Sequence, residues 1–154
     1  MVKFAVIKIR SDINARQEVK DTLRMLGLTR VNHCVLVDDD ESVLGMLRKV
    51  KDYVTWGEIR SDILQRLLAK RGRLAGDKRL TDEVIQSRLN FQSLADLAEK
   101  VVDGSVKLDE IGIKKVFRLH PPSGGYKSTK RPVKDLGDLG YRGDKINDLL
   151  IRMM

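Results

Sequence analysis

Seven basic residues and no acidic residue lie between Glu110 and Asp135. Within this stretch, the segment 120–134 (HPPSGGYKSTKRPVK) holds all three prolines of the chain and a Gly-Gly pair. Proline lacks a backbone N–H and paired glycines add conformational freedom, so we expect an arm here and not a central strand or helix. An apolar core cannot accommodate seven unpaired cations, so these side chains must face water or a polyanion.

The arm has the chemistry of nucleic-acid recognition. Lysine and arginine neutralise phosphates, and aromatic or imidazole planes stack on exposed bases. The predicted RNA-binding residues of this region are Arg118, His120, Tyr126, Lys127, Lys130, Arg131, Lys134 and, closer to the C-terminus, Arg142. Counterion release at the lysine and arginine contacts of the arm alone predicts a salt-dependence slope of about three. A merely solvated basic loop is the alternative.

A second group of candidate RNA-binding residues lies in the first third of the chain, on either side of a predicted helix that Ser11 or Asp12 can cap. Its members are Arg10, Ser11, Asn14 and Arg16 before the helix and Arg30, Asn32 and His33 after it. A helix of about 14 residues, rising about 1.5 Å per residue, would separate the two sets by roughly 20 Å. We therefore predict two separate contact points on a large folded RNA, the first of which includes free backbone donors at the helix start.

Local patterns predict the elements that position these residues. Residues 2–10, 33–37 and 53–59 are rich in β-branched and aromatic residues, which indicates strands. Apolar residues at helical spacing predict helices over 15–26 and 43–50. The order is β-α-β-α-β, so the expected fold class is α+β: a small sheet with helices on one face, followed by a C-terminal α+β extension.

This order divides the chain into a β-α-β-α-β RNA-binding core, residues 1–60, and a helical C-terminal subdomain, residues 61–154, which carries the arm at 120–134. The predicted elements of the second part are helices that begin near Ser61, Thr81, Asn90 and Asp144 and a short strand at 115–119.

Composition favours a polyanionic partner. The net charge of the 154 residues is +8, and residues 112–154 contain ten bases and four acids. Such a balance is typical of nucleic-acid binding, with an anionic membrane surface as the weaker option. The single cysteine cannot form an internal disulfide, and no apolar run is long enough for a secretion signal or a membrane span. We therefore expect a cytoplasmic protein without a membrane partner.

Enzymatic and metal-binding functions have little support. Neither His33 nor His120 has the spacing to Cys34 of a nucleophile and its base, and CxxC or HxxxH metal spacing is absent. The acids at 38–41 lack the glycine and alternating ligands of a calcium loop, so we expect them to cap a helix and complement its dipole. The glycines at 137–143 match neither the P-loop nor the dinucleotide fingerprint. We predict no catalytic residue, metal, cofactor or small-molecule substrate.

Two other classes of function stay open. One is a small-molecule-binding regulatory or catalytic domain on a β-α-β unit, which would use the acids at 38–41 or the glycines at 137–143. The other is a DNA-binding module. Stabilisation by a nucleotide or metal, without a response to RNA, would favour the first. Equal affinity for duplex DNA and structured RNA would favour the second, because an RNA reader exploits single-stranded features and 2′-hydroxyls.

Longer stretches carry a family resemblance. The core stretches are VIKIRSDINARQEVKDTLRMLGLTRVNHCVLV and GMLRKVKDYVTWGEI, and the second half contains FRLHPPSGG and GDKINDLLIRMM. Over essentially its whole length, the chain resembles the family of the large-subunit ribosomal protein L-thirty, in its long archaeal form. The lysine-rich N-terminal extension of the eukaryotic relatives is absent, which favours the archaeal form. Tyr141 and Gly143 flank Arg142 in place of the Asn-Arg pairing of the relatives, so Arg142 is a weaker match than Lys127 or Arg131.

The resemblance implies a ferredoxin-like sheet core with an added C-terminal subdomain. It also implies a non-enzymatic role in binding and organising ribosomal RNA of the large subunit, with contacts to 5S RNA and to neighbouring ribosomal proteins.

Overall fold

A five-stranded sheet with strand order β4-β2-β1-β3-β5 forms the centre of the protein. The structure is a computed structural model that describes residues 3–88 and 90–154. Its strands are β1 (Lys3–Lys8), β2 (His33–Asp38), β3 (Val54–Glu58), β4 (Val116–Arg118) and β5 (Gly140–Tyr141). Neighbouring strands are antiparallel, apart from the parallel pair β3 and β5. The helices are α1 (Gln17–Leu26), α2 (Glu41–Lys49), α3 (Ser61–Arg71), α4 (Asp82–Arg88), α5 (Leu94–Asp103) and α6 (Ile146–Met153), and the 3₁₀ turns are η1 (Leu108–Ile111), η2 (Val133–Asp135) and η3 (Gly143–Lys145).

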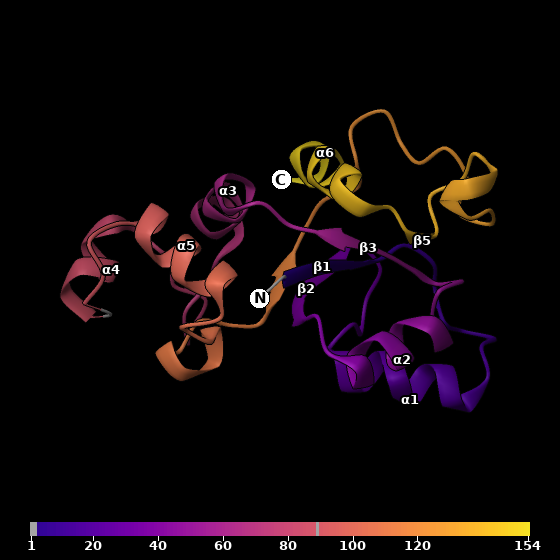
Figure 1. Cartoon of the computed structure of the whole chain (residues 1–154), viewed down its shortest axis with the longest axis horizontal. Helices are drawn as coiled ribbons and strands as arrows, with labels where there is room; N and C mark the ends of the chain where they lie inside the picture. Colours follow the sequence, from indigo (N-terminus) through magenta and orange to yellow (C-terminus); the bar gives the residue numbers. More distant parts are fainter. Residues whose placement is uncertain (1–2, 89) are drawn as a thin grey trace.

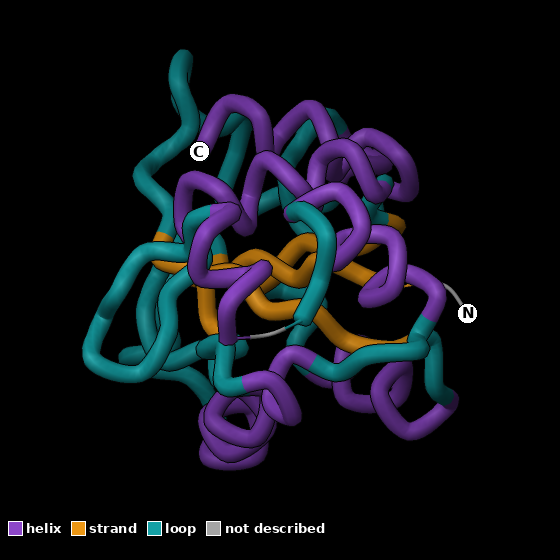
Figure 2. The backbone as a smooth tube through the Cα atoms, turned by 90° about the vertical axis from the view of Figure 1, so that its left-hand side faces the viewer, coloured by secondary structure: helices purple, strands orange, loops and turns teal. Residues whose placement is uncertain are grey.

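The predicted α+β class with a β-α-β-α-β core is confirmed, and helices cover both faces of the sheet (Figures 1 and 2). Helices α1 and α2 pack on one face, as expected for the core, and α3, α5 and α6 cover the other. The alternation in β1 explains both layers: Phe4 and Val6 point into the first core, and Ala5 and Ile7 into the second. Every residue of β1 is buried because the strand lies at the centre of the sheet.

Residues 61–154 add a strand to each edge of this sheet. β4, the strand expected at 115–119, pairs with β2, and β5 pairs with β3. Between them the chain forms the predicted proline-glycine arm. The division of the chain near residue 60 stays a prediction. No helix of the described residues is long and apolar enough to span a membrane.

The strand register gathers many loops at one end of the sheet. β1 ends where β2 and β3 begin, because Ile7 pairs with Cys34 and Lys8 with Val54. β4 also ends there and β5 begins there. We call this the basic end and define it as residues 8–16, 30–33, 51–53 and 118–139; the loops before α1 and before β5 project on the right of Figure 1.

Candidate nucleic-acid interface

The two contact points predicted in the first third of the chain form one surface. We expected a helix to separate them by roughly 20 Å, and this was wrong. α1 begins only at Gln17, and β2 is the antiparallel neighbour of β1, so the segment after α1 returns to the end where β1 stops. The backbone N–H of Asn32 donates to the carbonyl of Lys8 at 2.7 Å. Arg10 and Arg30 therefore lie at the same end of the sheet.

A partly buried ion pair holds the loop between β1 and α1. The ammonium of Lys8, a residue only 1% exposed, lies 3.1 Å from the carboxylate of Asp12. Asp12 is therefore not the helix cap that we expected, and Arg16 occupies the N-cap position of α1. The guanidinium of Arg10 lies 5.6 Å from the centre of the Tyr53 ring, in a cation–π contact. These contacts set the direction in which the loop presents its cations.

Acid should weaken this loop through Asp12. Burial acts to raise the pKa of Asp12, but the hydrogen bond and charge of Lys8 outweigh it and hold the pKa below the usual 3.8. A carboxyl group with a lowered folded-state pKa contributes stability above its unfolded pKa and loses it as pH falls through the folded value. We expect Asp12→Asn to be less stable at neutral pH, because Lys8 loses its partner. The variant should also lose less stability than the wild type as the pH falls below 3.8.

Urea denaturation from neutral pH to about pH 2 measures this difference. Asp21→Asn, at an exposed position of α1, is the matched control and should keep the wild-type pH profile. Identical profiles for Asp12→Asn and wild type would show that the ion pair does not stabilise the fold.

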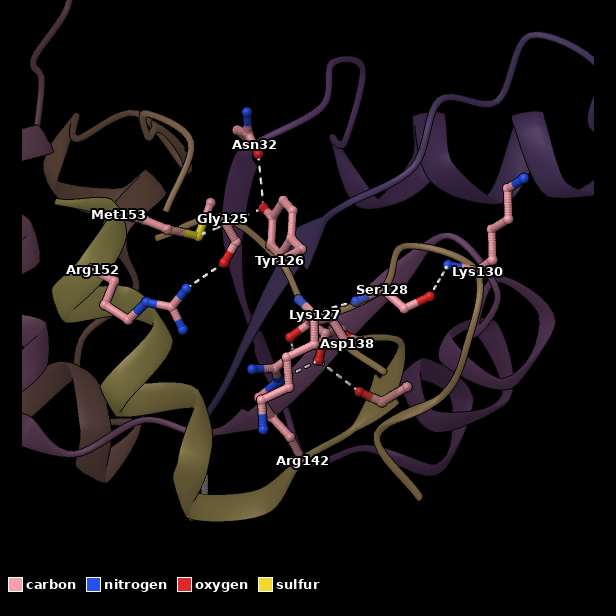
Figure 3. A network of polar contacts seen from close by, with 12 residues as sticks. Asn32, Gly125, Tyr126, Lys127, Ser128, Lys130, Asp138, Arg142, Arg152 and Met153 are labelled. Atoms are coloured by element: carbon pink, nitrogen blue, oxygen red, sulfur yellow. Dashed lines mark hydrogen bonds and ion pairs between the residues drawn. The ribbon is translucent and has the colours of Figure 1, made fainter. Parts of the chain in front are cut away.

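Asn32 connects three segments of the basic end. Its backbone N–H donates to Lys8, and its carbonyl accepts from Leu119 at 3.2 Å. Its side-chain oxygen accepts the hydroxyl proton of Tyr126 at 2.8 Å (Figure 3). Asn32 has a φ of 68°, a left-handed conformation that asparagine adopts more readily than most residues. The end of β1, the end of β4 and the arm therefore meet at one residue.

The arm is anchored by a buried carboxylate (Figure 3). Asp138, 5% exposed, accepts hydrogen bonds from the backbone N–H groups of Lys127 and Ser128. The same carboxylate pairs with the guanidinium of Arg142 at 3.0 Å. At the start of the arm, Arg152 of α6 donates to the carbonyls of Ser123 and Gly125. The arm thus has a defined path in the fold, while its basic side chains point outward.

The cationic side chains that we predicted to bind RNA are exposed, with the exception of Arg142. They are Arg10, Arg16, Arg30, Arg118, Lys127, Lys130, Arg131 and Lys134, and Ser11 and Asn14 are exposed beside them. Within residues 3–88 and 90–154, none of these cations forms an ion pair with a carboxylate. Cations gathered without counter-charges repel one another, and a bound polyanion relieves that repulsion.

The remaining predicted site residues are occupied by contacts within the protein. Arg142 is largely buried and also donates to the hydroxyl of Thr55 at 2.8 Å, so it joins the arm to β3. The ring nitrogens of His120 lie within hydrogen-bond distance of the carbonyls of Pro121 and Met154. Burial raises the pKa of Tyr126 to about 12, so its hydroxyl stays a donor to Asn32. RNA contact by these side chains stays a prediction.

His33, another predicted RNA-binding residue, has a ring nitrogen that lacks a hydrogen bond. Its Nδ1 is buried and has no hydrogen-bond partner among the residues that the structure describes. Burial, followed by the positive charges of Arg118 and Arg30, lowers the pKa of His33, so the ring is neutral at pH 7. His33 therefore adds a neutral ring, and no further charge, to the basic end.

Sequence reasoning missed four residues that shape this surface. Lys8 and Asp12 form a partly buried ion pair, Asp138 forms a buried one with Arg142, and Lys51 adds an exposed cation just before β3. Lys51 was detectable, because a residue between α2 and a strand antiparallel to β1 must lie near the end of β1. The ion pairs had no local signal. A further basic stretch, residues 70–79, is not part of the basic end, and the carbonyl of its residue Arg73 accepts a backbone hydrogen bond from Lys114, just before β4.

The structure provides no support for metal or thiol chemistry. No group of three or more potential ligands gathers to hold a metal ion in the described part of the chain. Burial raises the pKa of the Cys34 thiol to about 12, so it remains protonated and unreactive. Within the acids at 38–41, Asp38 pairs with Lys3, and Asp40 stands at the N-cap position of α2 without a side-chain hydrogen bond to the helix. The expected side-chain cap is therefore absent at Asp40, and Glu41 complements the helix dipole from the first turn of α2.

The fold and this surface define a class: basic α+β proteins whose sheet end presents cations to a polyanion. The family model described as "Ribosomal protein L30p/L7e" matches residues 4–54. Relatives named "Large ribosomal subunit protein uL30" align over nearly the whole chain. The relative from Methanothrix thermoacetophila is 47% identical over 150 residues, 97% of this chain and 99% of its own. The relative from Methanobrevibacter smithii is 46% identical over 151 residues (98% and 99%), and that from Methanococcus maripaludis strain C5 49% over 153 residues (98% and 99%). The chain belongs to this ribosomal protein family, as the resemblance implied.

Proposed function

We propose that this protein is a structural constituent of the large ribosomal subunit, in the cytoplasm, and that it binds and organises ribosomal RNA with the basic end of its sheet. Its relatives are named as proteins of that subunit. The observation that carries the proposal is the convergence of exposed cations from three loops, among them Arg10, Arg30 and Lys130, without carboxylate partners in the described residues. The protein is not an enzyme, because the family is a structural component of the ribosome.

The contacts beneath the surface support binding to a rigid, folded RNA. The Lys8–Asp12 pair, the Asn32–Tyr126 hydrogen bond and the Asp138 carboxylate hold the loops in place before any ligand arrives. Preorganised loops lose less conformational entropy on binding, so more of the electrostatic gain appears as affinity. The cations neutralise phosphates and release counterions, which makes the affinity dependent on salt. We propose neighbouring ribosomal proteins and 5S RNA as further partners of the protein in the large subunit.

Replacing Lys130 and Arg131 together with alanine tests the interface. Both side chains are exposed, so the double variant should melt within about 2 °C of the wild type. Loss of two phosphate contacts should lower the slope of log affinity against log salt by about 1.5 and weaken binding about tenfold near physiological salt. Filter binding to large-subunit ribosomal RNA across a salt series measures both quantities.

Lys78→Ala combined with Arg79→Ala is the matched control. It removes the same charge from exposed positions of the stretch 70–79, which is not part of the basic end, and should keep the wild-type salt slope. If both double variants lose affinity equally, the net charge binds RNA and the basic end has no special role. A large loss of thermal stability in the arm variant would mean that its side chains are packed.

The same assay separates the other classes of function. An RNA reader should prefer structured ribosomal RNA to duplex DNA of equal length, since A-form grooves and 2′-hydroxyls differ from those of DNA. Equal affinity for the two would support a DNA-binding module. Thermal stabilisation by a nucleotide, with no response to RNA, would support a small-molecule domain.

A further inference from the structure

One edge of the sheet is only partly covered. β4 pairs with β2 along residues 33–35, so no strand of the described residues lies beside residues 36–38 on that side. The reason lies in the chain before β4. Ile113 forms a bridge with Leu74, and the N–H of Lys114 donates to the carbonyl of Arg73 at 2.9 Å. This pairing draws the chain away from β2 and leaves a short stretch of strand edge open.

An apolar groove of about 620 Å³ runs along this open edge. Residues 35–38 of β2 and Leu108 of η1 are among the residues that line it. Met25 of α1 and Val43 and Met46 of α2 contribute apolar side chains. Met25 is 69% exposed, which is high for a large apolar side chain. Backbone hydrogen-bonding groups beside an apolar trough suit an extended peptide, which satisfies both at once.

The charge at the groove is opposite to that of the protein as a whole. The chain carries a net charge of +8, but Asp38, Asp39 and Asp40 line the groove in succession. Four aspartates and three lysines line the groove. Lys3 pairs with Asp38 and Lys115 with Asp109, and Lys107 is exposed without an ion pair in the described residues. Asp39 and Asp40 are exposed and form no ion pair within residues 3–88 and 90–154.

We infer that this groove binds an extended, lysine- or arginine-rich segment of another protein, which adds as a strand to residues 36–38 of β2. The backbone edge would pair with the main chain of the segment, and alternate apolar side chains would enter the trough. Its basic side chains would lie against Asp39 and Asp40. Carboxylates repel phosphates, so the groove does not suit RNA. The surface is separate from the basic end, because β2 runs from that end toward Asp38.

An NMR titration of the full chain tests the inference. The probe is a short peptide in which valine and lysine alternate, and backbone amide shifts are recorded. Saturable shifts at residues 36–38 are expected. A peptide with glutamate in place of lysine should bind at least about tenfold more weakly, because like charges then face one another. The lysine peptide with a central proline should also bind at least about tenfold more weakly, because proline cannot donate to a strand ladder.

Variants of the chain locate the binding site. Asp39→Lys should weaken the lysine peptide by about tenfold, and Asp82→Lys, an equal charge change on α4, should not. Met25→Gln, a neutral change at an exposed position, tests the trough independently of charge and should weaken the binding of the peptide. RNA affinity should stay unchanged in all three variants. The inference is overturned by an absence of saturable shifts, by equal affinity for the glutamate peptide, by shifts confined to the basic end, or by displacement of the peptide by ribosomal RNA.

Discussion

Asp138→Ala should lower the free energy of unfolding by about 3–5 kcal/mol, because it leaves a buried guanidinium without its partner. Asp138 is 5% exposed, and its carboxylate faces Arg142 at 3.0 Å. The same carboxylate accepts from the backbone of Lys127 and Ser128, so three donors lose their acceptor at once. Urea denaturation measures the loss. The affinity for ribosomal RNA should fall as well, since the base of the arm is no longer held.

Two further variants separate the ion pair from the general effect of removing charge. Asp135→Ala, at an exposed position directly after the arm, should change stability by no more than about 0.5 kcal/mol. Asp138→Leu combined with Arg142→Met should recover much of the lost stability, because apolar residues can replace a buried ion pair at little cost. A loss below about 1 kcal/mol in Asp138→Ala would mean that water solvates Arg142 and that the pair does not hold the arm.

Gly57→Ala should lower the free energy of unfolding by about 3 kcal/mol through overpacking. Gly57 lies in β3, where a Cβ atom would overlap the carbonyl oxygen of Gly143 and lie 2.9 Å from the Cβ of Ile146. Moving α6 away from β3 would also break a hydrogen bond, because the side-chain amide of Asn147 donates to the carbonyl of Glu58 at 3.0 Å. The methyl group would therefore force η3 and α6 away from β3. For a chain of this size, the melting temperature should fall by about 6–12 °C, as calorimetry can measure.

Gly45→Ala is the same substitution at another position, and there we expect a gain in stability. Gly45 lies within α2, and a Cβ there would meet nothing within 4 Å. Alanine should raise stability by about 0.5–1 kcal/mol, because glycine loses more conformational freedom in a helix. If both variants destabilise the protein equally, close backbone packing of β3 on η3 is not the cause.

Patterns within short stretches were sufficient for most elements. The alternation of β1 and the apolar spacing of α1 and α2 are local properties, so they predicted a β-α-β-α-β core that the structure confirms. Prolines and paired glycines likewise predicted the arm between β4 and β5. β5 itself was not predicted, because Gly140 and Tyr141 are too few to show any periodicity. The helix expected from Asn90 starts at Leu94, after Ser93, whose side chain accepts a hydrogen bond from the backbone of Asp96.

For the candidate interface, local patterns predicted which residues are exposed cations but did not predict how these residues are arranged in space. Types and spacing of residues identified the cations, since charge must face water or a polyanion wherever the chain folds. They did not place Arg10 beside Arg30, because that neighbourhood depends on the antiparallel register of β1 and β2. Nor did they find the hydrogen bond between Asn32 and Tyr126, which are 94 residues apart. Composition and periodicity are properties of a segment, whereas convergence of loops and burial of ion pairs exist only after distant segments have packed together.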